Sequence, residues 1–209
     1  MLRDTQNTTV AKNDFGILLT RILIDVMRTK NFDRSRVSIP GAKKTVFRFK
    51  QDMIEIDVVT DSISKVLEYI SSNFMVVDIR NVRERTSEAN PSISEILNHL
   101  LECEILSLSE RFWECHTALE SVWMHSSAEY KIFLQSIILF SSSQAKYQML
   151  NIDAARGMYL RAHMMLLKSG KSTMVLTDLK DDFYYPINWR FNISSEIRTR
   201  FYLRYFNLE

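Results

Sequence analysis

The chain has 209 residues, of which 46% are hydrophobic and 25% are charged, and its formal net charge is +2. This composition is typical of a globular protein with a substantial core, and it excludes an intrinsically disordered chain. The low content of glycine and proline, four and three residues, favours long regular elements. A net charge so close to zero selects neither a nucleic acid nor an anionic surface as the partner.

Several functional classes lack their usual signals. The two cysteines, Cys103 and Cys115, lie in apolar helical contexts, and their number and spacing indicate neither a disulfide framework nor a zinc site. The first twelve residues are polar and contain no apolar stretch of a signal peptide. The apolar runs are shorter than the ~20 residues that a membrane span needs. We therefore expect a soluble, cytoplasmic protein without a membrane segment, and the sequence names no cofactor.

The N-terminal part, residues 13–84, predicts a small α/β module with a three-stranded sheet. Apolar residues crowd the segment 14–28, which we interpret as a largely buried helix. A basic connector over 31–44 follows, and its Pro40–Gly41 pair indicates a turn.

The strands of this module are predicted further along the chain. Residues 45–50 and 53–59 alternate polar with apolar side chains, which predicts a hairpin around the Gln51–Asp52 turn. The module is completed by a short helix over 61–70 and a third strand over 74–79.

The segment 91–170 predicts an antiparallel helical bundle after a polar linker. Ser92 and Glu95 form a capping box at its start, and Ser109 is the expected cap of the second helix. Asn151 is the expected cap of the last helix, which Gly170 ends. The remaining residues, 171–209, form an aromatic extension that we expect to pack on the body or to contact another copy. The fold class is therefore mainly α.

Three blocks of residues within 105–170 carry a family resemblance. The first lies in the apolar second helix of the bundle, the second in the next helix and the third in the last. In order, they are Phe112, Trp113, Glu114, His116, Leu119, Glu120 and Trp123; Phe133, Leu134, Gln135 and Ile138; and Asn151, Ala155 and Gly157. Their order and spacing resemble the family catalogued as domain of unknown function 309, a small all-helical domain. The resemblance implies a fold and a clustered polar patch, and it implies no reaction.

The chain departs from the family pattern at three polar positions. Thr117 stands where the family has a second glutamate, Ser136 where it has glycine, and Lys146 where it has histidine. A family metal site built on several carboxylates would have lost ligands here.

His116 and Glu120 are the first candidate site. Their i, i+4 spacing makes them neighbours on the flank of an apolar helix, whereas Glu114 points about 160° away from His116. We expect them to face Gln135 and Lys146 on the next helix. Such a cluster suits a satisfied polar network, an acid/base pair of a hydrolase or a ligand site. Two ligands at this spacing are too few for catalytic zinc, so we assign no metal residue, and His99, His125 and His163 show no spacing that would add one.

Two further sets of residues suit binding. Trp113 and Trp123, with Phe133, form an aromatic pocket in one interpretation and ordinary core in another. The segment 28–50 carries eight basic residues against one acidic residue, which suits either a solvated face or a nucleic-acid surface. The candidate nucleic-acid contacts are Arg34, Arg36, Lys43 and Lys44.

The sequence leaves the function unknown and favours one class. We expect a non-enzymatic binding or interaction protein, with self-association through the bundle or the aromatic extension as a possible use. The first alternative is a metal- or acid/base-dependent hydrolase that uses His116 and Glu120. The candidate ligand contacts are Trp113, Trp123, Gln135 and Lys146. The second alternative, which we favour least, is nucleic-acid binding through the segment 28–50.

Overall fold

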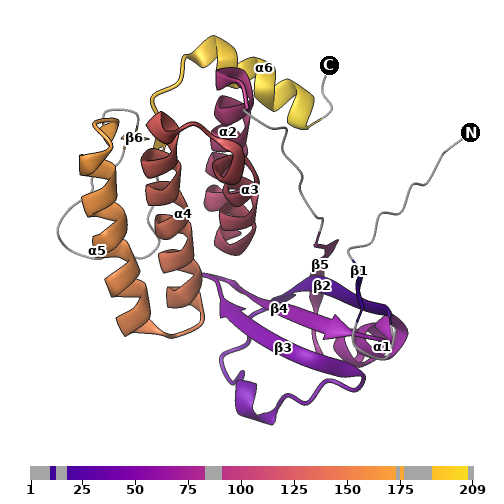
Figure 1. The fold of residues 1–209 in the computed structure, drawn as a ribbon. Coiled ribbons are helices and arrows are strands. Elements are labelled where there is room, and N and C mark those ends of the chain that lie inside the picture. Colours follow the sequence, from indigo (N-terminus) through magenta and orange to yellow (C-terminus); the bar gives the residue numbers. More distant parts are fainter. Residues whose placement is uncertain (1–9, 13–17, 83–90, 173–174, 177–189, 207–209) are drawn as a thin grey trace, which may run out of the picture. The chain divides into compact units, whose positions relative to one another are not determined.

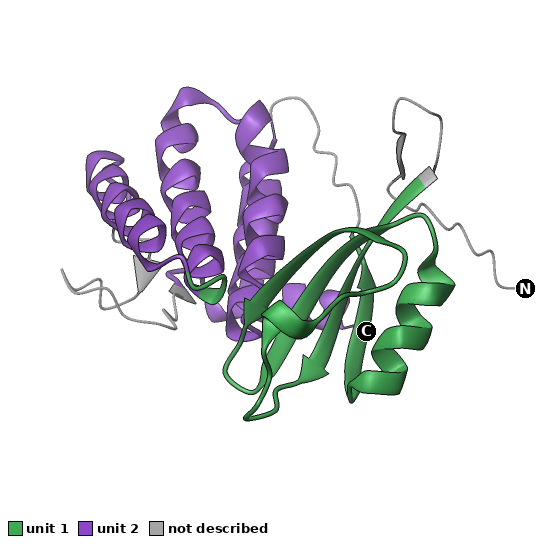
Figure 2. Cartoon of the chain, turned by 90° about the horizontal axis from the view of Figure 1, so that it is seen from below, with its two compact units in different colours: residues 1–84, 148–150 green, residues 85–147, 151–209 purple. Residues whose placement is uncertain are grey.

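The structure is a computed structural model that describes residues 10–12, 18–82, 91–172, 175–176 and 190–206. The chain divides into two compact units (Figure 2). Unit 1 contains residues 1–84 and 148–150, and unit 2 contains residues 85–147 and 151–209. Each unit has its own hydrophobic core.

Unit 1 is built on an antiparallel sheet of five strands (Figure 1). β2 is central, with β4 on one side and both β1 and β5 on the other, and β3 continues the sheet beyond β4. The elements of this unit are β1 (Val10–Lys12), β2 (Leu18–Met27), the short 3-10 helix η1 (Arg34–Arg36), β3 (Ala42–Phe49), β4 (Met53–Thr60), α1 (Ile63–Asn73) and β5 (Val76–Asn81).

Two expectations for this unit are wrong. The sheet has five strands where we expected three, and the segment expected as a helix over 14–28 contains the strand β2. The helix was expected because apolar residues occur on both faces of this strand. Ile22, Ile24 and Val26 face the core that the sheet forms with α1, and Leu23 on the opposite face is also buried. A strand with apolar residues on both faces does not alternate strictly, and periodicity alone does not distinguish it from a buried helix.

The predicted hairpin is confirmed. β3 and β4 pair antiparallel, with Arg48 opposite Glu55 and Phe49 opposite Ile54. The turn expected at Pro40–Gly41 is present, and Gly41 has a φ of +81°. Only glycine adopts this left-handed conformation without strain, so Gly41 suits the approach to β3.

Unit 2 contains the helical bundle (Figure 1). Its connections, residues 109–111, 126–127 and 149–151, are short enough to make consecutive helices antiparallel neighbours. α4 lies between α5 on one side and the α2–α3 pair on the other. The elements are α2 (Ile93–Leu108), α3 (Phe112–His125), α4 (Ala128–Gln148), α5 (Ile152–Lys168), β6 (Val175–Leu176), β7 (Arg190–Phe191) and α6 (Ser195–Tyr205).

Caps define the ends of these helices. The Ser92 hydroxyl accepts a hydrogen bond from the Glu95 backbone N–H at 3.1 Å, and the Asn151 side chain accepts one from Ala154 at 3.3 Å, as predicted. Gly170, with a φ of +66°, follows the end of α5. The prediction for Ser109 is wrong, because its N–H donates to the carbonyls of the preceding helix and thus ends α2.

The bundle core is aromatic and aliphatic. Phe140 of α4 packs edge-on against Tyr159 of α5, with ring centroids 5.5 Å apart, and the Ser143 hydroxyl donates to the Ala155 carbonyl at 2.8 Å. The C-terminal segment joins this core through the buried side chains of Phe191 and Ile193. None of the helices in the described ranges has both the length and the apolar character that a membrane crossing requires.

Cys103 and Cys115 correct a further expectation. Their sulfur atoms form a disulfide that joins α2 to α3, with the Cα atoms 4.7 Å apart. The two positions are twelve residues apart in sequence, and the antiparallel turn of the chain at 109–111 brings them together. The Ser141 hydroxyl of α4 lies 3.1 Å from the Cys115 sulfur, so this pair lies where three helices meet.

Candidate functional site

Helix α3 presents one side to the core and one flank away from it. Cys115, Ala118, Leu119 and Val122 are fully buried on the core side. Trp113, His116, Glu120 and Trp123 lie along the adjoining flank, because their spacing of three, four and three residues follows the helical repeat. We call these four residues the α3 flank.

The pair that the spacing permits is present on this flank. His116 Nδ1 lies 3.7 Å from Glu120 Oε2, and the side chains are 16% and 49% exposed. Burial lowers the pKa of His116 below its ordinary value, and the charge of Glu120 opposes this lowering only in part. His116 is therefore neutral near pH 7, so one of its ring nitrogens can accept a proton.

The two tryptophans lie on either side of this pair along the helix. The Trp113 ring stacks on the His116 ring, with centroids 5.1 Å apart and an angle of 14° between the planes. Trp123 is partly buried against the core, and Lys131 Nζ of α4 lies 5.8 Å from the centre of its ring. Both tryptophans thus combine packing with an accessible part, which is the usual condition of aromatic residues at binding surfaces.

The structure does not join this flank to the other predicted members of the cluster. Gln135 and Lys146 are half-buried on α4. Within the described part of the chain, neither forms a hydrogen bond or an ion pair with His116 or Glu120. Glu114 is also separate, since both of its carboxylate oxygens accept hydrogen bonds from Arg111, at 2.7 and 2.5 Å.

Two of the remaining histidines have partners outside the flank. His125 Nδ1 is 3.1 Å from the Ser121 carbonyl, and the His163 ring is 6.5 Å from the Tyr159 ring. Over the ranges that the structure describes, no three histidine, cysteine or acidic residues gather as metal ligands would.

A layer of buried ions on the sheet of unit 1 was not foreseen as a unit. Arg48 donates to Glu55 at 2.6 Å and to Asp57 at 2.7 Å, and Lys50 donates to Asp25 at 2.8 Å. The layer, which we call the ionic layer, also receives Arg21 and Arg80. Its seven residues are Arg21, Asp25, Arg48, Lys50, Glu55, Asp57 and Arg80.

The cations of the layer keep Asp57 and Asp25 ionised. Burial alone would raise the pKa of Asp57, but the hydrogen bonds from Arg21 and the charges of Arg48 and Arg21 outweigh it and lower that pKa. Asp25 has a lowered pKa for the same reason, with Lys50 and Arg80 as its cations. The layer is therefore a set of satisfied ion pairs, in which removal of one partner leaves a buried charge uncompensated.

The signal for this layer was present in the sequence. Charged residues occupy every second position of the predicted hairpin, at Arg48 and Lys50 on one strand and at Glu55 and Asp57 on the other. Side chains at alternate positions share a face of a sheet, and the predicted Gln51–Asp52 turn places Arg48 opposite Glu55. The sequence does not show that Asp25 and Arg80 belong to this layer, because it does not show that their strands pair with each other and with the hairpin.

The basic side chains of the segment 28–50 are thus divided between two places, because Arg48 and Lys50 belong to the ionic layer and others lie at the surface. Of the candidate nucleic-acid contacts, Arg36 pairs with Asp33 at 3.2 Å and Lys43 pairs with Asp61 at 2.7 Å. Arg34 and Lys44 are exposed. Nucleic-acid binding by these four residues stays a prediction.

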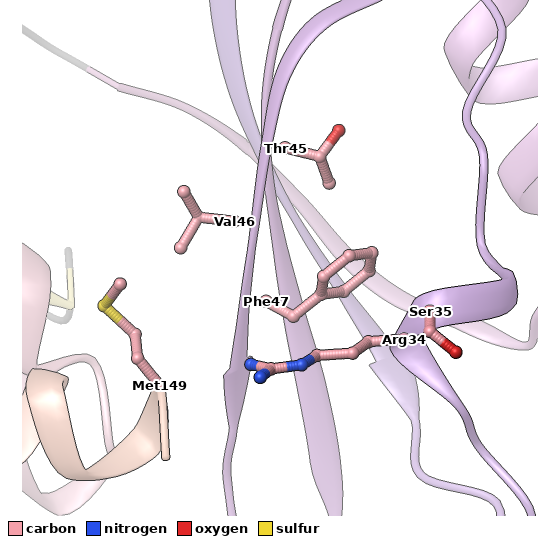
Figure 3. Close-up of a pocket in the computed structure, with 6 residues that line it drawn as sticks. All are labelled: Arg34, Ser35, Thr45, Val46, Phe47 and Met149. Carbon is pink, nitrogen blue, oxygen red and sulfur yellow. The ribbon is translucent and has the colours of Figure 1, made fainter. Parts of the chain in front are cut away.

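A cavity of about 430 Å³ lies beside β3 (Figure 3). Arg34 supplies the one charged side chain among its lining residues, and it lies near Phe47 in the view of Figure 3. The lining residues are Arg34, Ser35, Thr45, Val46, Phe47 and Met149. They contain no pair of ionisable groups for acid/base chemistry, so we assign no reaction to this cavity.

Comparison with known families gives one match. Residues 103–158 match the model described as Domain of unknown function (DUF309). This range covers the last six residues of α2, all of α3 and α4, and the first part of α5. Neither a curated protein nor a solved structure matches the chain. The predicted resemblance to this family is confirmed by the match over residues 103–158.

Proposed function

We propose that this chain is a non-enzymatic interaction protein that binds a partner through the α3 flank. One observation carries the proposal: the Trp113 ring is stacked on His116 beside the exposed carboxylate of Glu120. The opposite side of the same helix is sealed in the core, so the flank is presented on a rigid support.

The chemistry of the flank favours a basic peptide segment as the partner. Tryptophan supplies much of the binding energy at protein interfaces, because it buries a large rigid area at a small entropic cost. Glu120 adds one accessible negative charge next to the Trp113–His116 stack. Lys131 already lies over the Trp123 ring within the chain, which illustrates that this ring accepts a cation.

The test uses nuclear magnetic resonance with a defined probe, a short peptide of alternating arginine and leucine. We expect saturable shifts of the Trp113 and Trp123 indole N–H signals, a weaker effect in Glu120→Gln and none in Glu120→Lys. Glu129→Gln, an exposed acid at the start of α4, is the matched control. Equal binding by wild type and Glu120→Lys would reject the α3 flank as the binding surface.

A hydrolase is the second candidate, favoured by the lowered pKa of His116. A neutral imidazole is suited to draw a proton from water, and the Glu120 carboxylate lies 3.7 Å from its Nδ1. The test is hydrolysis of p-nitrophenyl acetate by wild type, His116→Gln and Glu120→Gln. A rate that falls to the buffer rate in His116→Gln would support a hydrolase, and an unchanged rate would exclude His116 as the base.

The organisation and setting of the chain are proposals as well. We infer an α/β module over 13–84, a helical bundle over 91–170 and a C-terminal extension over 171–209. The separate cores of the two units support the first division, and the buried Phe191 supports the packing of the extension on the bundle. We also infer a cytoplasmic setting from the composition; the disulfide is the observation against it, because such bonds are rare in reducing compartments.

A further inference from the structure

Helix α5 carries an apolar stripe on the side opposite its core contacts. Ala155, Tyr159, Ala162 and Leu166 are buried at the spacing of one helical face. On the other side, Leu160, Met164 and Leu167 are 44%, 71% and 59% exposed. The three exposed residues recur at intervals of four and three, so they form a continuous stripe. Gly157 extends the stripe by one turn, and a Cβ atom added there would meet nothing within 4 Å.

Opposite charges mark the two ends of this stripe. Asp153 lies in the first turn of α5 and Lys168 in the last. Both are exposed, and within the described part of the chain neither takes part in an ion pair. Fifteen residues separate them, which corresponds to ~22 Å along a helix.

We propose that this face of α5 pairs with the same face of a second copy of the chain, in antiparallel orientation. A two-fold axis between Leu160 and Arg161 places Asp153 opposite Lys168 of the other copy at each end of the contact. The same register places Met164 opposite Gly157 twice, and at the centre Leu160 lies opposite Arg161 of the other copy. One surface thereby contacts an identical surface, as a closed two-fold interface requires.

Charge and shape both select this arrangement. A parallel pairing would place Asp153 against Asp153 and Lys168 against Lys168, and like charges at both ends oppose association. The antiparallel register also places the longest exposed side chain of the stripe, Met164, against the position without a side chain, Gly157. Two helices pack more closely where a protruding side chain of one fits into a gap between side chains of the other.

The interface is small. One helix face on each copy offers less than the ~800 Å² per partner of a stable protein interface. We therefore expect a weak dimer whose population rises with protein concentration. This inference does not depend on the α3 flank, because α5 contributes none of its four residues.

Sedimentation velocity of the full chain tests the proposal over a roughly hundredfold range of concentration, since mass action makes a weak dimer concentration-dependent. Asp153→Lys and Lys168→Asp each place like charges at both ends, and each should raise the dissociation constant at least tenfold. The double variant D153K/K168D exchanges the charges and should restore it. Glu68→Lys, a reversal of an exposed acid on α1, should leave association unchanged.

Gly157→Leu provides an independent check. It fills the gap that Met164 would occupy, while leucine is a better helix former than glycine. We expect the monomer to melt no lower than wild type in circular dichroism, together with loss of the dimer. A protein that stays monomeric at every concentration, or a dimer that neither single charge reversal weakens, would overturn the proposal. Failure of the double variant to restore the dimer would overturn the register.

Discussion

His116 illustrates how much of this protein is decided by the surroundings of single side chains. Its spacing to Glu120 places the two on one flank, but the spacing does not set the charge state of the imidazole. The Trp113 ring and the core contacts of α3 remove water from the ring, and this desolvation lowers its pKa. The residue is thus held neutral, although a carboxylate lies 3.7 Å away.

The lowered pKa of His116 makes stability depend on pH. The folded state binds the proton less readily than the unfolded state, so the contribution of His116 is fully present above its unfolded pKa of about 6.5 and declines as the pH falls below it. We expect His116→Gln to flatten the fall of the free energy of unfolding between about pH 7 and pH 5. His125→Gln, at the exposed end of the same helix, is the control.

Urea denaturation at several pH values measures this effect. A proton nuclear magnetic resonance titration of His116 measures the pKa itself. A value at or above that of an unfolded histidine would contradict the burial seen in the structure.

At the scale of elements, the sheet of unit 1 is joined by charges as much as by apolar packing. The face of β2 and β4 that includes Ile24 and Ile56 packs in the core with α1, whereas the other face carries the ionic layer. Ion pairs across strands specify the register of strand pairing. If one strand shifted by one residue, its charged side chains would move to the apolar face of the sheet. The layer therefore determines which strands pair and in what alignment.

Loss of one acid from the ionic layer should be costly. Asp57 accepts from Arg21 and Arg48, and both Asp57 and Arg48 are buried. Asp57→Asn should lower the free energy of unfolding by about 3–5 kcal/mol, since it leaves buried cations without full compensation. The matched control is Asp33→Asn, whose exposed pair with Arg36 should contribute far less to stability. Urea midpoints measure both, and equal small effects would contradict a structural role of the layer.

At the scale of the whole molecule, the two units hold separate cores, and the tryptophans report on one of them. Trp113, Trp123 and Trp189 all lie within the residue range of unit 2. Tryptophan fluorescence therefore follows the unfolding of unit 2, while hydrogen exchange of the β2 and β4 amides follows unit 1.

We expect Asp57→Asn to shift the unfolding of unit 1 and to leave the tryptophan transition in place, because Asp57 belongs to unit 1. Leu119→Ala, which empties a fully buried site in the second core, should do the reverse at a cost of about 2–5 kcal/mol. Urea titrations read by fluorescence and by hydrogen exchange measure both shifts. A common shift of both signals in either variant would indicate one cooperative body.

Local patterns determined the features that depend on residues a few positions apart. The hairpin of β3 and β4, the caps at Ser92 and Asn151 and the family resemblance within residues 105–170 were all predicted from such patterns. In each case the interacting groups are near in sequence, so their chemistry is visible without a fold.

Tertiary structure decided what depends on distant residues. β2 is a strand because β4 and β5 pair with it, and the cross-strand ion pairs of Asp25 follow from that pairing. The Cys103–Cys115 contact depends on the packing of α2 on α3, and the lack of a bond from Gln135 to His116 depends on how α3 and α4 turn against one another. Burial and long-range pairing arise only when separated segments meet, and for that physical reason no local pattern contained them.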